Sequence, residues 1–411
     1  MTIRFHFLLK LILIPLFMFS CMKSDDPPPA PVVVPPPPDK YLYVSTGLCY
    51  AGIGFTAPAI GTVGKTLSRL NLSNLNIEMV RDYADLSQEV AGTYAAGMQL
   101  GSDGYIYAAV ENAVATGSRR IDKIEKKYQG AQSIWYQNSS VLTTVNRGLS
   151  IASDGGLLLN RTTIIERFDS TPTRKLATLT LAWGQTHAGA CVTNNTLVTD
   201  VISLPAYTGT TFGKYIYAHA TAGQNDIGII SMNGSIAAAE CLANQQSITA
   251  TLTNSATANL GWNNVLSANS TPTSLVYIAT PPPATTTGKL LVAYSTATLN
   301  TAVASGLNNA LVMYDITESS SSAVTLDNGQ VLYHDHQYFF GVTGMTYDEA
   351  SSTLYVATSN SFAVAPVGYN IEKFTIDITT PGATRVPNTN GSSFQSSNTY
   401  NNCVTDMFVA E

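Results

Sequence analysis

Short runs of β-branched and aromatic residues recur along most of the chain, and Gly, Asn, Asp or Ser closes each run within about ten residues. Apolar and polar positions alternate inside many of these runs, which is the period of a half-buried strand. Stretches with the 3.6-residue period of an amphipathic helix are scarce. The pattern therefore predicts one all-β domain over residues 40–411.

Four segments repeat one order: a glycine, a short alternating strand, a polar turn and a second apolar strand. They open at Gly97, Gly148, Gly189 and Gly344. Asp103-Gly104 and Asp154-Gly155 supply two of the turns, because glycine accepts the positive φ of tight hairpins. Alternating segments that we expect to be outer strands follow hairpins of this kind, at Arg120–Glu125, Ile164–Asp169, Leu311–Ile316 and Ile371–Asp377.

This succession of strands resembles the blades of YVTN-type, NHL-type and lactonase-like β-propellers, and the resemblance implies a ring of radial sheets. The first three openings lie 51 and 41 residues apart, and the 155 residues from Gly189 to Gly344 fit three blades of roughly 50. We expect one hidden blade to start near Gly261, with Ser274–Ala279 as its second strand. The sequence thus predicts a seven-bladed propeller, although six or eight blades are also compatible.

The two ends of the domain supply one shared blade. Tyr41–Thr46 reads as a second strand without a first, and Cys403–Ala410 reads as a first strand without a second. We therefore predict that the ring is closed by pairing of the N- and C-terminal strands, with Cys403 opposite Cys49 and Ala410 opposite Leu42. Closure of this kind leaves few exposed strand edges.

Four cysteines of the domain are compatible with two disulfides, and sequence alone allows three pairings. The predicted closure favours Cys49 with Cys403, and this choice leaves Cys191 to pair with Cys241. Their spacing contains no Cys-x-x-Cys and does not indicate a zinc site.

The N-terminus reads as a leader, because a short basic region precedes an apolar run, Leu11–Phe19, that ends at Ser20-Cys21. It resembles the lipobox of bacterial lipoproteins, which implies a signal peptide over residues 1–20 and acyl chains, palmitate among them, on Cys21. Residues 21–39 hold eight of the 19 prolines and form a stiff tether. We expect a lipid-anchored protein of the cell envelope. In Gram-negative lipoproteins an aspartate after the lipidated cysteine favours the inner membrane, so Met22 implies the outer membrane if the host is Gram-negative. The protein would then lie in the periplasmic leaflet or at the cell surface.

Charged residues make up 12% of the chain, and the net charge is −6 with no basic cluster, which disfavours nucleic acid as a partner. No Gly-x-Ser-x-Gly, P-loop or His-Glu-x-x-His motif occurs in the domain. Loops that precede first strands and follow second strands gather on one face of a propeller. That face would present Glu111, Asn112, Arg147, Asn160, Arg161, His187, Asp200, Tyr338 and Asn360.

Mixed charge, amides and an aromatic ring on such a face suit a protein or carbohydrate partner. We therefore expect a binding or scaffold protein, favour a non-enzymatic role, and expect no cofactor. The alternative comes from the resemblance to gluconolactonase-like propellers, which hold a divalent metal with Glu, Asn and Asp. It implies a metal-dependent, lactonase-like hydrolase that binds Ca²⁺ through Glu111, Asn160 and Asp200.

Overall fold

The fold was analysed in a computed structural model, in which Asp39–Glu411 form one compact unit. The structure describes residues 38–47, 66–112, 119–137, 146–151, 155–161, 164–168, 175–180, 197–204, 213–221, 224–232, 239–247, 270–280, 287–295, 309–318, 324–334, 338–359, 369–397 and 403–411. None of the helical segments in these ranges has the length and apolar character needed to cross a membrane.

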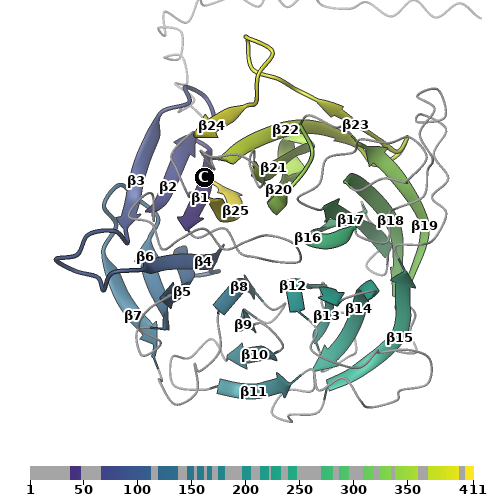
Figure 1. Cartoon of the computed structure of the whole chain (residues 1–411), viewed down its shortest axis with the longest axis horizontal. Helices are drawn as coiled ribbons and strands as arrows, with labels where there is room; N and C mark the ends of the chain where they lie inside the picture. Colours follow the sequence, from purple (N-terminus) through teal and green to yellow (C-terminus); the bar gives the residue numbers. More distant parts are fainter. Residues whose placement is uncertain are drawn as a thin grey trace, which may run out of the picture. The chain divides into compact units, whose positions relative to one another are not determined.

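Six antiparallel sheets stand around a common centre, each with four strands in succession from the inside outwards. The innermost strands are β25, β4, β8, β12, β16 and β20, and each of them contacts the next in this order until the last contacts the first. The described chain is therefore an all-β propeller with six blades (Figure 1). The prediction of seven blades was wrong, and the alternative of six is the one observed.

Blade 1 combines both ends of the domain and consists of β25 (Cys403–Ala410), β1 (Tyr41–Gly47), β2 (Thr66–Asn71) and β3 (Ile77–Asp82). Blade 2 consists of β4 (Thr93–Leu100), β5 (Tyr105–Asn112), β6 (Arg120–Glu125) and β7 (Gln132–Tyr136). Blade 3 consists of β8 (Asn146–Ile151), β9 (Leu157–Arg161), β10 (Ile164–Phe168) and β11 (Lys175–Thr180).

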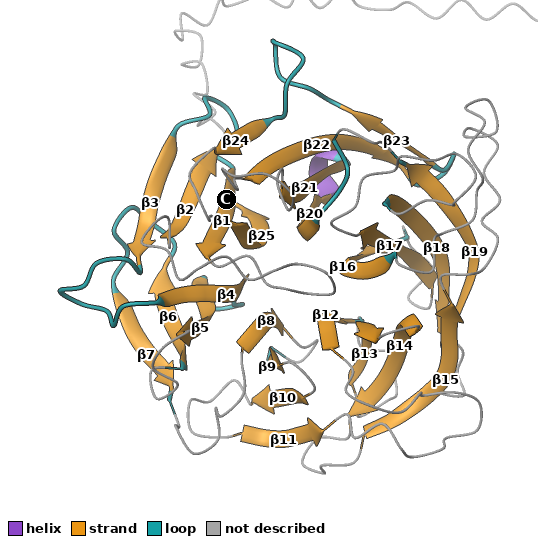
Figure 2. Cartoon of the chain, viewed as in Figure 1, coloured by secondary structure: helices purple, strands orange, loops and turns teal. Residues whose placement is uncertain are grey.

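Blade 4 consists of β12 (Leu197–Ser203), β13 (Gly213–Thr221), β14 (Gln224–Met232) and β15 (Ala239–Ser247). Blade 5 consists of β16 (Thr271–Ala279), β17 (Thr287–Ser295), β18 (Ala310–Glu318) and β19 (Val324–Tyr333). Blade 6 consists of β20 (Val342–Asp348), β21 (Thr353–Ser359), β22 (Tyr369–Asp377) and β23 (Gly382–Arg385), and β24 (Gln395–Ser397) also pairs with β22. Strands and loops make up almost all of these parts, apart from a 3₁₀ turn, Glu349–Ser351 (Figure 2).

The core lies between blades, because a blade is covered by a neighbour on each face. Trp135 of blade 2, for example, packs in one buried cluster with Phe168 of blade 3, and their rings meet edge to face at 6.0 Å. The middle strands consequently read as almost continuous apolar runs; in β5 every residue after Tyr105 is buried. The predicted turns are also present, since Gly104 and Gly155 have φ of 80° and 83°.

Pairing of the terminal strands is confirmed, but the predicted register was wrong, by one residue at Ala410 and by two residues at Cys403. Ala410 lies opposite Tyr41, and a bulge in β25 places Cys403 opposite Gly47. A shift of one residue exchanges the two faces of a strand. The observed register brings Tyr43 opposite Phe408, with their rings stacked at 4.7 Å.

The cysteine pairings stay predictions. Cys403 is buried at the start of β25. Cys49 and Cys191 lie outside the described residues, and for Cys241 the structure describes the backbone but not the side chain.

The blade count differed from the prediction because blades 4 and 5 are long. Ser274–Ala279, predicted as a second strand, belongs to β16, which is the innermost strand of blade 5. The markers Gly189 and Gly261 lie outside the described residues. The four segments predicted as outer strands all form the third strand of a blade, as β6, β10, β18 and β22.

Candidate functional site

All six innermost strands carry a β-bulge at the same level, where one residue has no partner on the second strand. The extra residues are Ala96, Arg147, Thr199, Thr273, Thr343 and Thr405. The residues that directly follow them form what we call the channel ring: Gly97, Gly148, Asp200, Ser274, Gly344 and Asp406. Three of the glycines that marked blades in the sequence are members of this ring.

A narrow polar cavity of about 90 Å³ lies inside the channel ring, and all six innermost strands contribute to its lining. Its titratable groups are Arg147, Asp200 and Asp406, and Ser and Thr hydroxyls supply most of the remaining polar side chains. Sites for small organic ligands usually measure about 300–1,000 Å³. This cavity has room for a few water molecules or an ion. A second cavity of about 260 Å³ adjoins it and shares Gln99, Leu275 and Met345 with its lining.

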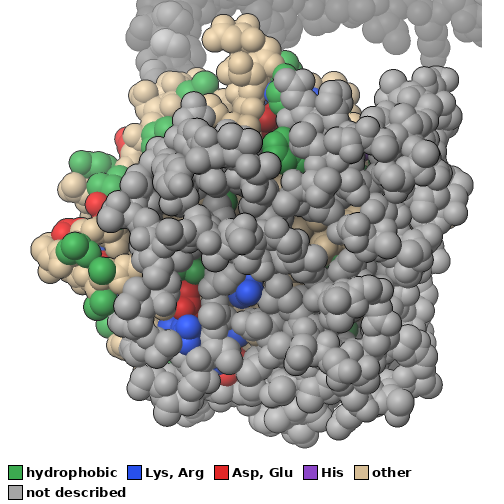
Figure 3. All heavy atoms as spheres, viewed as in Figure 1, with side chains coloured by type: hydrophobic (Ala, Val, Ile, Leu, Met, Phe, Trp, Pro, Cys, Tyr) green, Lys and Arg blue, Asp and Glu red, His purple; other side chains and the backbone are tan. Residues whose placement is uncertain are grey.

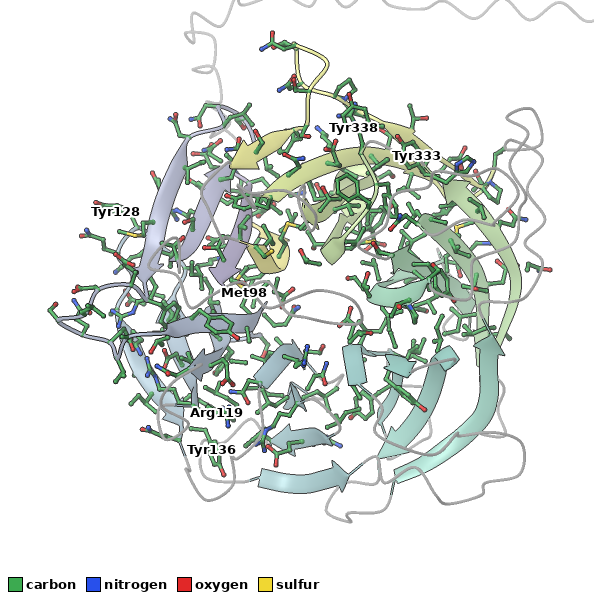
Figure 4. All side chains as sticks on the ribbon, viewed as in Figure 1. Met98, Arg119, Tyr128, Tyr136, Tyr333 and Tyr338 are labelled. Carbon is green, nitrogen blue, oxygen red and sulfur yellow. The ribbon has the colours of Figure 1, made fainter. Side chains whose placement is uncertain are left out.

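Two opposite blades present the same side chains to this cavity. Asp406 of blade 1 accepts the backbone N–H of Met98 in blade 2 at 2.8 Å, and Asp200 of blade 4 accepts that of Leu275 in blade 5 at 2.7 Å. Met98 and Leu275 each follow the channel-ring residue of their own blade. Figure 4 shows Met98 at the inner end of blade 2.

The threonine before each aspartate binds the same neighbouring strand. Thr405 donates its hydroxyl to the Ala95 carbonyl at 2.6 Å, and Thr199 donates to the Pro272 carbonyl at 2.6 Å. Each Thr-Asp pair thus supplies one donor and one acceptor to the next blade, an arrangement that we call a Thr-Asp clamp. The clamps join blade 1 to blade 2 and blade 4 to blade 5.

The surroundings of the clamps disfavour ionised carboxylates. Burial raises the pKa of Asp406 to about 8, and the charge of Asp200 contributes in the same direction, whereas the N–H of Met98 opposes the shift. Burial likewise raises the pKa of Asp200 to about 6, against the N–H groups of Leu275 and Val201. The folded protein therefore favours the protonated form of Asp406 more strongly than that of Asp200.

Four of the residues predicted for the binding face are buried within the ring. Glu111 accepts from Arg119 at 2.8 Å, and burial raises its pKa in spite of this arginine. Asn112 donates to Thr93 at 2.8 Å, Asn160 donates to the Val198 carbonyl at 3.3 Å, and Arg161 pairs with Glu166 at 2.9 Å.

The other five predicted residues are distributed over different parts of the protein. Arg147 and Asp200 line the channel cavity. Tyr338 lies near the outer rim of blade 6, with the Arg385 guanidinium 3.5 Å from its ring centroid (Figure 4). His187 and Asn360 lie outside the described residues. The nine residues therefore do not form one described surface, and their binding role stays a prediction.

The predicted metal ligands are not assembled by the described strands. Asp200 lies on an innermost strand, whereas Glu111 and Asn160 end second strands of blades 2 and 3 and bond to neighbouring strands there. Within the described residues, no three His, Cys, Asp or Glu side chains come together as a metal site. Ca²⁺ binding stays a prediction.

Sequence reasoning missed Asp406 and Thr405, although a signal was present. The tripeptide Val-Thr-Asp occurs at residues 198–200 and again at residues 404–406, each time at the bulge of an innermost strand. Comparison of the two strands would have paired Asp406 with Asp200.

No protein-family model matches the chain, and no curated protein matches it. Among solved structures, a protein of unknown function from Bacteroides caccae shares 11% identity at a TM-score of 0.45, covering 91% of this chain and all of that one. One from Bacteroides thetaiotaomicron shares 9% at 0.42, covering 77% and 72%. A proposed gluconolactonase shares 10% at 0.38, covering 83% and 93%. These similarities concern the fold and carry no argument about activity.

Proposed function

We propose that this protein is a lipid-anchored binding or scaffold protein of the cell envelope, which presents its propeller to a protein or carbohydrate partner. The observation that carries this proposal is the surface of blades 1 and 2, where large apolar side chains lie open to solvent. The polar side chains of the channel ring, in contrast, bind neighbouring strands. Binding at the rim suits this geometry better than chemistry in the channel.

The exposed large hydrophobic residues among the described parts of the chain all come from blades 1 and 2 and the segment joining them. Leu86 is 70% exposed, and Ile77, Tyr128 and Ile134 are each more than half exposed. Hydrophobic side chains follow this edge in the space-filling view (Figure 3). We call this surface the blade 1–2 rim: Leu75, Ile77, Leu86, Val90, Tyr105, Tyr128 and Ile134. Contiguous apolar surface rimmed by polar residues marks interaction sites, and we infer such a site at this rim.

A buried ion-pair network supports the segment that carries Leu86. Glu89, which is 8% exposed, binds Arg81 at 2.6 Å and Arg120 at 2.8 Å, and Arg120 also binds Asp122 at 2.7 Å. The network joins the β3–β4 connection to the third strand of blade 2. A pre-organised loop loses less conformational entropy on binding, so its apolar tip is better suited to contact a partner.

The anchor is tested by replacing Cys21 with alanine. We expect the wild-type protein to partition into the detergent phase and Cys21→Ala to enter the aqueous phase, because two or three acyl chains contribute about 0.8 kcal/mol per buried methylene. Phase partitioning and the mass of the N-terminal peptide measure the outcome. A variant that stays in the detergent phase would exclude the lipid anchor at this cysteine.

Binding is tested with a photoreactive amino acid at Leu86 in the full chain on intact cells. We expect a discrete crosslinked species from this position and none from the matched exposed position Thr375 on blade 6. Mass spectrometry identifies the species. Equal crosslinking at both positions, or none at either, would contradict a binding role for the blade 1–2 rim.

A further inference from the structure

Blades 1 and 2 enclose a groove that the function proposed above does not yet use. It has a volume of about 520 Å³ and lies between β3 and the segment that leads into β7. This volume falls within the usual range of about 300–1,000 Å³ for small-ligand sites. The polar side chains of its lining are Arg81, Asp82, Asp85, Gln88, Gln129 and Gln132.

The groove offers hydrogen-bonding groups that the protein uses only in part. Asp82 accepts the N–H of Ala84 through Oδ1 at 2.8 Å, and Asp85 accepts the N–H of Ser87 through Oδ1 at 2.9 Å. Within the described residues, neither Oδ2 atom has a donor. Gln88 accepts from Arg81 through Oε1 at 2.6 Å, and its amide nitrogen has no acceptor there. The open groups are thus carboxylate acceptors and an amide donor on one wall. On the other wall, the side-chain amide of Gln129 lines the groove and has no hydrogen bond to the described residues.

The walls are held in position before any ligand binds. Arg81 bridges Gln88 and Glu89, so the charge network of the rim also fixes this wall. On the other side Gln129 donates its backbone N–H to the Met79 carbonyl at 3.0 Å and has a φ of 47°. A non-glycine residue in this region is strained, and such strain persists where the surroundings over-determine it.

We propose that this groove binds a neutral oligosaccharide. A sugar hydroxyl is both donor and acceptor, so neighbouring hydroxyls match a carboxylate oxygen and an amide at the same time. Tyr128, 55% exposed and next to Gln129 in the chain, offers a flat apolar face of the kind that packs against a sugar ring. The proposal rests on the binding role proposed above and names the ligand class for this part of the surface.

Other ligand classes fit the groove less well. Asp82 and Asp85 oppose an anion. An extended peptide would pair with a free strand edge, but the Met79 and Val80 carbonyls of β3 already accept the N–H groups of Gln129 and Gly130. Side chains rather than main chain therefore provide recognition in the groove.

The test is calorimetry and an array of neutral di- to tetrasaccharides with the full chain in detergent. We expect at least one saccharide to bind. Gln129→Gly and Asp82→Asn should each weaken its binding at least tenfold. Gln129→Gly removes the amide while glycine relieves the positive φ, so the variant should fold well. The matched control is Asn328→Gly on blade 5, where φ is 53° and binding should not change.

Failure of every saccharide, or binding that both groove variants leave unchanged, would overturn the oligosaccharide proposal. A basic peptide that binds and is lost in Asp82→Asn would also overturn it. The crosslinking experiment at Leu86 separates the two proposals. A specific partner there with no saccharide binding would leave the binding role standing without this ligand, whereas failure of both experiments would remove the binding role as well.

Discussion

Gly97→Ala is expected to lower the free energy of unfolding by about 3 kcal/mol or more, at the upper end of the cost of overpacking a core. A Cβ atom on Gly97 would lie 2.5 Å from the Cα of Gly148 and 2.5 Å from the backbone nitrogen of Leu149. Both atoms belong to the backbone of blade 3, so no side-chain rotation can relieve the contact. Blades 2 and 3 would have to separate. Urea denaturation measures the loss.

The matched control is Gly148→Ala, at the same channel-ring position one blade further on. The nearest atom to a Cβ there is the Asn160 Cβ at 3.8 Å, which is an ordinary contact. We expect a change within about 1 kcal/mol. Equal losses in the two variants would show that the close approach of blades 2 and 3 does not limit the residue at position 97.

Asp406 is expected to make the protein less stable as the pH rises. Its pKa in the folded protein is about 8, above the usual 3.8 of an aspartate, so folding favours the protonated form. The stabilisation is fully present below about pH 4 and is lost as the pH rises through about 8. We expect a decrease of about 3 kcal/mol, which is less than the full shift corresponds to, because the half-buried carboxyl keeps contact with the channel.

Asp406→Asn should remove the loss of stability between about pH 6 and 8 and leave only the contribution of Asp200, whose pKa is about 6, and thermal unfolding between pH 4 and 9 measures both. The readout is the slope of stability against pH, not stability itself. The two carboxylate oxygens of Asp406 accept the N–H groups of Met98 and Met407, and asparagine keeps only one of these acceptors, so Asp406→Asn lowers stability at every pH. Asp200→Asn should shift the remaining transition to lower pH, since the charge of Asp200 raises the pKa of Asp406. Parallel profiles for wild type and Asp406→Asn would contradict the assignment.

Local pattern was sufficient for the strands and for ring closure, but not for the number of blades. The glycine that opens blades 2, 3 and 6 stands at the channel ring, where the bulge is. Blades 4, 5 and 1 place Asp200, Ser274 and Asp406 at that position, so a search for glycine passes over them. The spacing also varies, from 51 residues between Gly97 and Gly148 to 74 between Asp200 and Ser274.

The candidate site was harder to predict because burial depends on neighbouring blades. Glu111 and Asn160 were expected at loop ends, and they do end second strands. Their partners, however, are contributed by the next blade: the backbone N–H of Asn146 binds Glu111, and the Val198 carbonyl binds Asn160. Nothing in the residues around Glu111 indicates which strand will cover it. Asp200 and Asp406 likewise face one channel cavity from opposite blades, an arrangement that the residues around either aspartate do not indicate.

The pairing of β1 with β25 also sets the order in which the molecule can be completed. Blade 1 receives its innermost strand from Cys403–Ala410, and the first clamp joins Met98 to a residue 308 positions later. During synthesis or translocation, the sequences of blades 2 to 6 are therefore already present before the ring can close. Contacts over such separations are slow to form because a long loop must close first. Until then, the inner edge of β1 has no strand partner and β4 lacks the neighbouring strand that it contacts in the closed ring, so another chain can still pair with β1.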